Sequence, residues 1–241
     1  MLKACLNGSL RRHEHPAVPI TPAEVAADAV RCESAGAAAV HVHPRDEEGR
    51  ETLAADAVDA TVAALRRSCP ELPVGVSTGA WIAPDPDERV AAIESWGVLP
   101  DFASVNAHEE GAERVAAALH SRGIGVEAGL WTPAAVAAYQ AWRVPCVRLL
   151  LECMEPEEEA ALANAHAMLA ALGGAAQSVP VLLHAEGPAV WAVLREAVQL
   201  ALHVRVGLED TRMMPDGTMA SGNRALVEAA VTFGATSGSA V

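Results

Sequence analysis

The amino-acid sequence predicts a single (β/α)8 TIM barrel. Short apolar segments alternate with Ala-rich helical segments, and eight such pairs follow one another along the chain. Eight pairs in 241 residues leave about 30 residues for each strand and its helix, which is typical of this barrel. The strand segments are nearly uninterrupted apolar runs, as expected when helices cover a parallel sheet. The alternative is an open, doubly wound sheet, but no Gly-x-Gly-x-x-Gly motif follows the first strand to indicate its dinucleotide-binding form.

The predicted strands and helices alternate without interruption. We expect strands at 2–6, 38–44, 73–77, 102–106, 124–130, 146–152, 179–184 and 203–209. We expect helices at 22–35, 52–68, 86–96, 109–121, 133–141, 156–172, 188–200 and 221–233. No linker or low-complexity segment divides this series, so residues 1–241 are expected to form one domain.

The first helix has the clearest boundary signals. Thr21 is a suitable N-cap, Pro22 fits the first helical position, and Glu24 completes a capping box with Thr21. Gly36 is typical of a helix end because it tolerates a left-handed backbone conformation. Local sequence alone should therefore fix both ends of this helix.

The composition excludes several classes of protein. Hydrophobic residues make up 51% of the chain, which supports a large core and excludes a disordered protein. A net charge of −14 without a basic stripe argues against nucleic-acid binding. No apolar run approaches the ~18 residues of a transmembrane helix, and the first residues lack a secretory signal pattern. Five scattered cysteines indicate free thiols in a reducing compartment, so we expect a cytoplasmic protein.

Polar side chains stand at the end of nearly every predicted strand. In a (β/α)8 barrel the carboxyl ends of the strands carry the active site, and buried polar groups without such a role would be costly. The strand ends hold Asn7, Ser9, His41, His43, Ser77, Thr78, Ser104, Asn106, Glu127, Glu152, His184, Glu186, Arg205, Glu209 and Asp210. Together they predict an active site at this end of the barrel.

The pair His41 and His43 predicts a metal site. Alternate residues on a strand point the same way, so both imidazoles should face the barrel axis. Two histidines at a strand end could also be ordinary hydrogen-bonded residues. A carboxylate on another strand favours the metal, and Glu209 is the preferred third ligand. Two histidines and one glutamate with an open position are typical of catalytic zinc.

The neighbouring carboxylates Glu209 and Asp210 need not share a role, because adjacent residues at a strand end point in different directions. With Glu209 on the metal, Asp210 is free to act as a base. Arg205 could pair with Asp210 if the eighth strand bends at Gly207. A structural salt bridge between Arg205 and Asp210 is the alternative.

The order of motifs resembles that of the β-keto acid cleavage enzymes, a family that includes the 3-keto-5-aminohexanoate cleavage enzyme. The motifs are ACLNGS, HVHPRD, VSTGA, SVNAHE, VEAGL, RVGLEDT, PDG and NRALV. The resemblance covers nearly the whole chain, and HxHxRD followed by RxGxED is its most specific part. It implies a zinc-dependent barrel enzyme that condenses a β-keto acid with acetyl-CoA and cleaves it to acetoacetate and a new acyl-CoA. It also implies a homo-oligomer, with a tetramer as the expected form.

The resemblance assigns roles position by position. His41, His43 and Glu209 match the zinc ligands of the family, and Asp210 with Arg205 matches its catalytic base and the partner of that base. We count Glu127, which matches an acidic residue on the fifth strand, with the catalytic candidates. The substrate-binding candidates lie at the ends of the third and fourth strands and are Ser77, Thr78, Ser104 and Asn106.

Two departures and two alternative functions accompany the resemblance. Leu10 stands where some members carry an acidic residue, and residues 152–156 replace a Gly-rich loop that longer members carry, so CoA contacts from that loop do not carry over. A metal-dependent hydrolase of the amidohydrolase type also begins with His-x-His, but it usually needs further His and Asp ligands. A non-catalytic barrel that binds a keto acid or an acyl-CoA is the other alternative.

Overall fold

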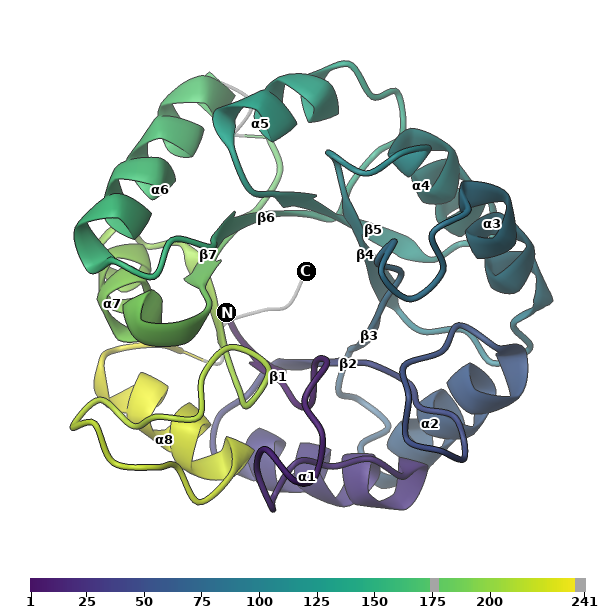
Figure 1. Cartoon of the computed structure of the whole chain (residues 1–241), viewed down its shortest axis with the longest axis horizontal. Helices are drawn as coiled ribbons and strands as arrows, with labels where there is room; N and C mark the ends of the chain where they lie inside the picture. Colours follow the sequence, from purple (N-terminus) through teal and green to yellow (C-terminus); the bar gives the residue numbers. More distant parts are fainter. Residues whose placement is uncertain (174–177, 237–241) are drawn as a thin grey trace.

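Eight parallel strands close into a barrel in the computed structural model, which describes residues 1–173 and 178–236 (Figure 1). Each strand pairs with the next, and β1 closes the ring on β8 with Leu2 opposite Val204. The strands are β1 (Leu2–Cys5), β2 (Ala39–Val42), β3 (Val74–Ser77), β4 (Phe102–Asn106), β5 (Gly125–Leu130), β6 (Arg148–Cys153), β7 (Val181–Ala185) and β8 (His203–Val206). This closed order confirms the predicted TIM barrel.

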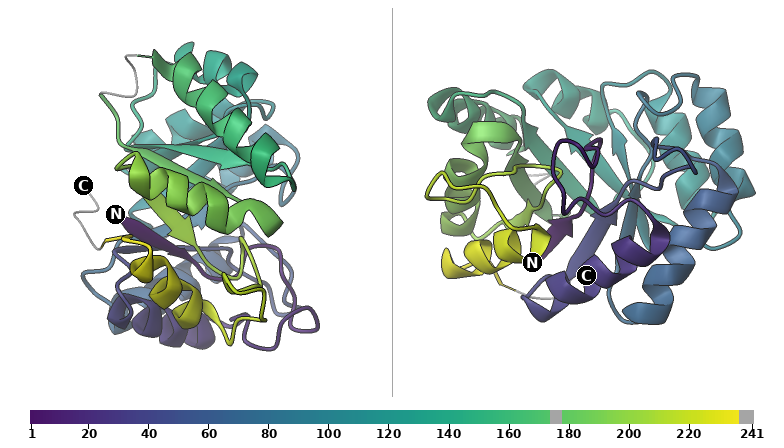
Figure 2. Two further views of the ribbon diagram at one scale, coloured as in Figure 1. Left: turned by 90° about the vertical axis from the view of Figure 1, so that its left-hand side faces the viewer. Right: turned by 60° about the horizontal axis from the view of Figure 1, so that its bottom comes forward.

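The helices form a ring outside the strands (Figures 1 and 2). They are α1 (Pro22–Ser34), α2 (Ala55–Ser68), α3 (Pro86–Ser95), α4 (Ala112–Ser121), α5 (Pro133–Gln140), α6 (Glu158–Leu172), α7 (Val190–Gln199) and α8 (Asn223–Thr232). The predicted helix 188–200 is divided: a short 3₁₀ turn, η2 (Gly187–Ala189), precedes α7. Pro188 lies in that turn and provides no backbone N–H for a regular helical hydrogen bond.

The predicted capping box at the start of α1 is confirmed. The Thr21 hydroxyl accepts a hydrogen bond from the Glu24 amide at 3.3 Å, and the Glu24 carboxylate accepts one from the Thr21 amide at 3.0 Å. Gly36 follows the helix with a positive φ of 113°, where a residue with a Cβ would be strained. Both ends of α1 are therefore set by local chemistry, as the sequence predicts.

Alternation along the strands separates two cores. Residues such as Leu2, Val40 and Val206 point outward and pack under the helices in the main apolar cluster. A second, small cluster lies inside the barrel and consists of Met1, Ala39, Phe102, Leu150 and Leu182. The remaining inward positions are largely polar, because the same alternation carries Lys3, His41, Glu127, Arg148 and Arg205 to the interior. The barrel axis is thus lined by charged side chains rather than by aliphatic layers alone.

Two further sequence-based expectations concern the cysteines and the membrane. All five cysteines are free thiols, and four of them are buried. Within residues 1–173 and 178–236, none of the helices combines the length and apolar character needed to cross a membrane.

Candidate active site

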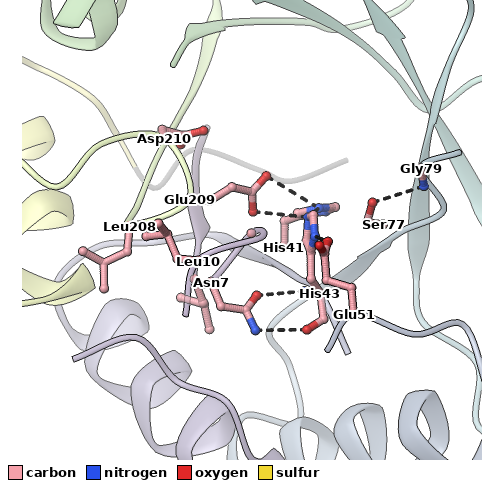
Figure 3. Close-up of polar contacts among 12 residues, drawn as sticks. Asn7, Leu10, His41, His43, Glu51, Ser77, Gly79, Leu208, Glu209 and Asp210 are labelled. Atoms are coloured by element: carbon pink, nitrogen blue, oxygen red, sulfur yellow. Dashed lines mark hydrogen bonds and ion pairs between the residues drawn. The ribbon is translucent and has the colours of Figure 1, made fainter. Parts of the chain in front are cut away.

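His41, His43 and Glu209 converge at the carboxyl end of the barrel (Figure 3). The two Nε2 atoms lie 3.1 Å apart. The Glu209 carboxylate lies 3.9 Å from His41 Nε2 through Oε1 and 3.6 Å from His43 Nε2 through Oε2. One ligand atom from each residue fits within a group no wider than 4.8 Å. The predicted trio is therefore assembled from β2 and the segment after β8.

Two glycines let Glu209 reach the histidines. A Cβ on Gly207 would lie 1.8 Å from the Cys5 carbonyl oxygen, so only glycine allows the end of β8 to pass this close to β1. A Cβ on Gly8 would lie 2.6 Å from Glu209 Cγ, and Gly8 also has a positive φ of 49°. Close backbone packing of β1 against β8 thus places the carboxylate.

His43 is held through both its backbone and its ring. Its backbone amide donates to Asn7 Oδ1 at 2.8 Å, and its carbonyl accepts from Asn7 Nδ2 at 3.0 Å. Its Nδ1 lies 2.5 Å from a carboxylate oxygen of Glu51, which also accepts a hydrogen bond from Trp81 Nε1 at 3.1 Å. A carboxylate on Nδ1 keeps the proton there and leaves Nε2 as the metal-ligating atom. Figure 3 shows Asn7 and Glu51 around His43.

Two of the three side chains are ready to bind a cation, and the third must first lose a proton. Burial lowers the pKa of His41 to about 3, so its ring is neutral. Burial also disfavours charge on His43, but Glu209 and Glu51 outweigh it and raise the pKa of His43 to about 9, so a metal that binds Nε2 displaces a proton from it. Burial would raise the pKa of Glu209, yet Arg205 and the histidines hold it well below its usual value. Glu209 Oε2 makes no hydrogen bond to any described residue, so this buried carboxylate retains a free ligand atom. The donor set fits a divalent metal such as zinc.

Arg205 joins Glu209 to Asp210. Its guanidinium donates two hydrogen bonds to Asp210 Oδ1, at 3.0 Å from Nε and 2.6 Å from Nη2, and also lies 2.9 Å from Glu209 Oε1. Burial raises the pKa of Asp210, and the Arg205 charge opposes that rise. Asp210 Oδ2 is buried and makes no hydrogen bond to the described residues. One oxygen is thus fixed, and the other is available to accept a proton.

A cavity of about 350 Å³ lies beside the trio. Three of the four predicted substrate-binding residues, Ser77, Ser104 and Asn106, line it, and Trp81 and Trp131 form part of its wall. The fourth, Thr78, is fully buried, and its hydroxyl donates to the Ser104 carbonyl at 2.7 Å. Thr78 therefore supports the backbone of β4 instead of lining the cavity.

Glu127 lies deeper in the barrel interior than the cavity lining. Its Oε2 lies 2.5 Å from Lys3 Nζ, and its Oε1 accepts a hydrogen bond from Arg148. Burial opposes its charge, but these two cations lower its pKa to about 2. Both oxygens are already bound, so the geometry favours a structural role for this catalytic candidate.

Sequence reasoning missed several residues that shape the site. Glu51 lies in the loop after β2, eight positions beyond His43. Strand periodicity does not indicate that this loop returns Glu51 to the His43 ring. The isolated bridge between Arg45 and Glu51 makes this return possible. Asn106 Nδ2 donates to Glu109 at 3.0 Å, and Glu109 is paired with the buried Arg89 at 2.6 Å. These partners belong to loops and helix starts, for which residue spacing carries little signal.

Burial also acts on a carboxylate at the end of β7. Glu186 lines the cavity, and burial raises its pKa to about 7; Asp210, Glu209 and Glu152 raise it further, whereas Arg205 opposes the rise. His184, on the same strand end, lies 3.6 Å from Asp210 Oδ1 through Nδ1 and 3.6 Å from Glu152 through Nε2. This side of the cavity is rich in carboxylates.

The chain is similar to curated enzymes over part of its length and to a solved structure over most of it. The chain is 30% identical over 107 residues to the 3-keto-5-aminohexanoate cleavage enzyme of Fusobacterium nucleatum, and 28% identical over 107 residues to that of Acetoanaerobium sticklandii. Each match spans 44% of this chain and 38% of the relative. A solved complex of ObcA with oxaloacetate has the same fold, with a TM-score of 0.70 at 19% identity over 92% of this chain and 65% of that chain.

The family model described as beta-keto acid cleavage enzyme matches residues 1–241, the entire sequence given. The trio His41, His43 and Glu209 lies within that match, and its ligand atoms are close enough together to hold a metal ion. The chain therefore belongs to the beta-keto acid cleavage enzyme family.

Proposed function

We propose that the protein is a zinc-dependent enzyme that condenses a β-keto acid with acetyl-CoA and releases acetoacetate and a new acyl-CoA. The observation that carries this proposal is the convergence of His41, His43 and Glu209 beside a carboxylate with one free oxygen, Asp210 Oδ2. To form a carbanion next to a carbonyl, an enzyme uses a metal ion that polarises the carbonyl and a base that removes the proton.

The metal would be held by His41 Nε2, His43 Nε2 and the Glu209 carboxylate. When bound, zinc supplies Lewis acidity to the keto and carboxylate oxygens of the substrate. Glu51 keeps the His43 ring in the orientation that directs Nε2 toward the site.

Asp210 is the proposed base. Arg205 fixes Oδ1, and Oδ2 accepts a proton from the carbon between the keto and carboxylate groups. Because burial raises the pKa of Asp210, it binds a proton more tightly than an exposed aspartate does. The resulting carbanion attacks the thioester carbonyl of acetyl-CoA. The expelled CoA thiolate adds to the original keto carbonyl, and the C–C bond beside that carbonyl breaks. This retro-Claisen cleavage gives the new acyl-CoA and the acetoacetate carbanion, which takes back the proton from Asp210.

Polar groups on β3 and β4 bind the substrate and the oxyanions in this proposal. Ser77, Ser104 and Asn106 line the cavity. Asn106 gives one amide proton to Glu109 and retains a second donor for a substrate oxygen. Such prearranged donors stabilise developing negative charge in a water-poor site. Consistent with the family, we propose a cytoplasmic homo-oligomer, with a tetramer as the expected form.

The direct test follows carbon from acetyl-CoA. We expect zinc-loaded protein, a panel of β-keto acids and acetyl-labelled acetyl-CoA to give acetoacetate labelled in its acetyl end. The unlabelled remainder of the keto acid should appear as the new CoA thioester. Product that forms without acetyl-CoA would instead identify a hydrolase of the amidohydrolase type. Binding of keto acid or acyl-CoA without turnover across the panel would identify a non-catalytic barrel.

A further inference from the structure

A second depression adjoins the active-site cavity at the carboxyl end of the barrel. It has a volume of about 690 Å³ and lies between η2, α7 and the loop that follows β8. Leu10 and Glu209 line both the cavity and this depression, which we call the β8 groove. Asp210, the proposed base, lines the groove but not the cavity, next in the chain to Glu209, which lines both.

The loop after β8 forms one wall of the β8 groove and is held in place. Trp191 Nε1 on α7 donates to the Met213 carbonyl at 2.9 Å, and Met213 forms an antiparallel bridge with Met219. At the other end of the loop, His15 Nε2 lies 2.9 Å from the Ala220 carbonyl. Figures 1 and 2 show this loop beside the loop that follows β1. The wall is therefore tied to both α7 and the β1 loop.

The walls of the β8 groove are apolar and partly exposed. Met213 and Met219 remain 41% and 61% exposed, and Met214, Pro188 and the buried Trp191 complete the surface. Flexible methionine side chains adapt to apolar ligand surfaces of varied shape. An exposed apolar surface next to a reactive centre indicates a ligand that extends out of the site.

Two arginines on the β8 groove have no carboxylate partner. Arg195 and Arg212 line it, and neither forms an ion pair with a described residue, although the chain carries 31 acidic residues. Arg195 lies over the Phe233 ring, with its guanidinium carbon 5.5 Å from the ring centre. Of the carboxylates that line the groove, Glu209 and Asp210 are bound to Arg205, and Glu158 lies in the first turn of α6. The groove thus offers two guanidinium groups to an anion.

We propose that the β8 groove binds the CoA part of the thioester, an inference that rests on the proposed function. Acetyl-CoA joins a reactive thioester, a long and narrow pantetheine arm and a pyrophosphate in one chain. In the groove the thioester would reach the junction at Leu10 and Glu209, beside Asp210. The arm would lie along the methionines and Trp191, and the phosphates would contact Arg195 and Arg212. Loops after the seventh and eighth strands often bind phosphate in this fold. The groove thus offers a lining of matching chemistry to each of these parts of the ligand.

The test measures CoA binding to zinc-loaded protein by calorimetry and the KM for both substrates. The variants are Arg195→Ala, Arg212→Ala and the double variant, with Arg143→Ala as the matched exposed control. We expect each single variant to weaken CoA binding and raise the KM for acetyl-CoA by about tenfold, since a charge-assisted hydrogen bond is lost. The double variant should bind CoA more weakly than either single variant. The KM for the keto acid and the zinc content should not change, and Arg143→Ala should resemble the native protein.

Two fragment probes define the ligand, and four outcomes would overturn the inference. Pantetheine and inorganic pyrophosphate should each bind far more weakly than CoA. Pyrophosphate that binds as tightly as CoA would make the groove a simple anion site. A change in molecular mass with unaltered CoA binding would make the arginines a subunit contact. If the double variant turns over acetyl-CoA and binds CoA as the native protein does, the groove does not bind CoA, but the proposed function still stands. A native protein that neither binds CoA nor transfers its acetyl group would overturn the proposed function as well.

Discussion

The barrel interior holds two buried clusters of charged side chains, which differ in whether every carboxylate oxygen has a hydrogen-bond partner. Near the amino ends of the strands, Glu127 is bound through both oxygens to Lys3 and Arg148. At the carboxyl ends, Arg205 binds Glu209 and Asp210, yet Glu209 Oε2 and Asp210 Oδ2 make no hydrogen bond to described residues. Burying a polar atom without a partner is costly, so a fold retains such atoms where a ligand or a reaction uses them. The deeper cluster supports the barrel, and the outer cluster is available for chemistry.

The deeper cluster also has apolar support. Lys3 Nζ and the Arg148 guanidinium carbon lie 5.4 Å and 5.7 Å from the centre of the Phe102 ring. A Cβ on Gly75 would lie 1.9 Å from this ring, so glycine on β3 makes room for it. The outer cluster instead borders a cavity. Burial is similar in the two clusters, and access to a ligand distinguishes them.

The largest effect is expected from Asp210→Asn. The amide keeps the size of the side chain but cannot act as the base, so turnover should fall by about 10³-fold or more. Metal content should remain near that of the native protein, because Asp210 is not one of the convergent ligands. Steady-state kinetics and metal analysis of the same preparation check this, with the exposed Asp216→Asn as control. Native turnover in Asp210→Asn would remove Asp210 from the mechanism.

Glu127→Gln should reduce stability instead of turnover. It leaves Lys3 and Arg148 buried without a counter-charge, which costs about 3–5 kcal/mol of unfolding free energy. Urea unfolding measures this cost, and active-site titration gives turnover per folded molecule, which should be unchanged. If Glu127→Gln lost turnover but kept the stability of the native protein, the two clusters would not differ in role, and Glu127 would be a catalytic residue.

Glu51→Gln should weaken metal binding by about 10–100-fold, since the variant loses the carboxylate that orients His43. A competition titration with a chelator measures this affinity. Glu48→Gln is the matched control, because Glu48 is in the same loop and pairs only with Arg50 among the described residues. Equal affinities of the two variants would show that Glu51 does not support the site.

The smallest effect is expected at Glu186, whose pKa is raised to about 7 by burial. Unfolded Glu186 ionises near pH 4.5, whereas the folded residue stays protonated until about pH 7, so it costs increasing stability between these values. In metal-stripped protein, Glu186→Gln should therefore be more stable than the native protein at pH 8, with little difference at pH 4. Thermal unfolding at the two pH values measures this, with the exposed Glu159→Gln as control. A difference that does not depend on pH would contradict the shifted pKa.

The sequence predicts the barrel and the metal trio because both follow from periodicity. His41 and His43 share one face of β2, and parallel strands place the end of β8 at the same end of the barrel. The same reasoning could not separate Glu127 from the site residues. Glu127 also points inward, and only its depth and its two cations show its different surroundings. Glu51 escaped prediction because loop conformation brings it to the His43 ring.

The central claim is that the unsatisfied outer cluster is a metal centre. It is tested most directly by the zinc content of the tag-free protein, measured beside His41→Ala and Glu127→Gln. We predict one zinc per chain in the native protein and in folded Glu127→Gln, and its loss in His41→Ala. A native protein that holds no metal after zinc is added back, or a His41→Ala variant that retains it, would contradict the account.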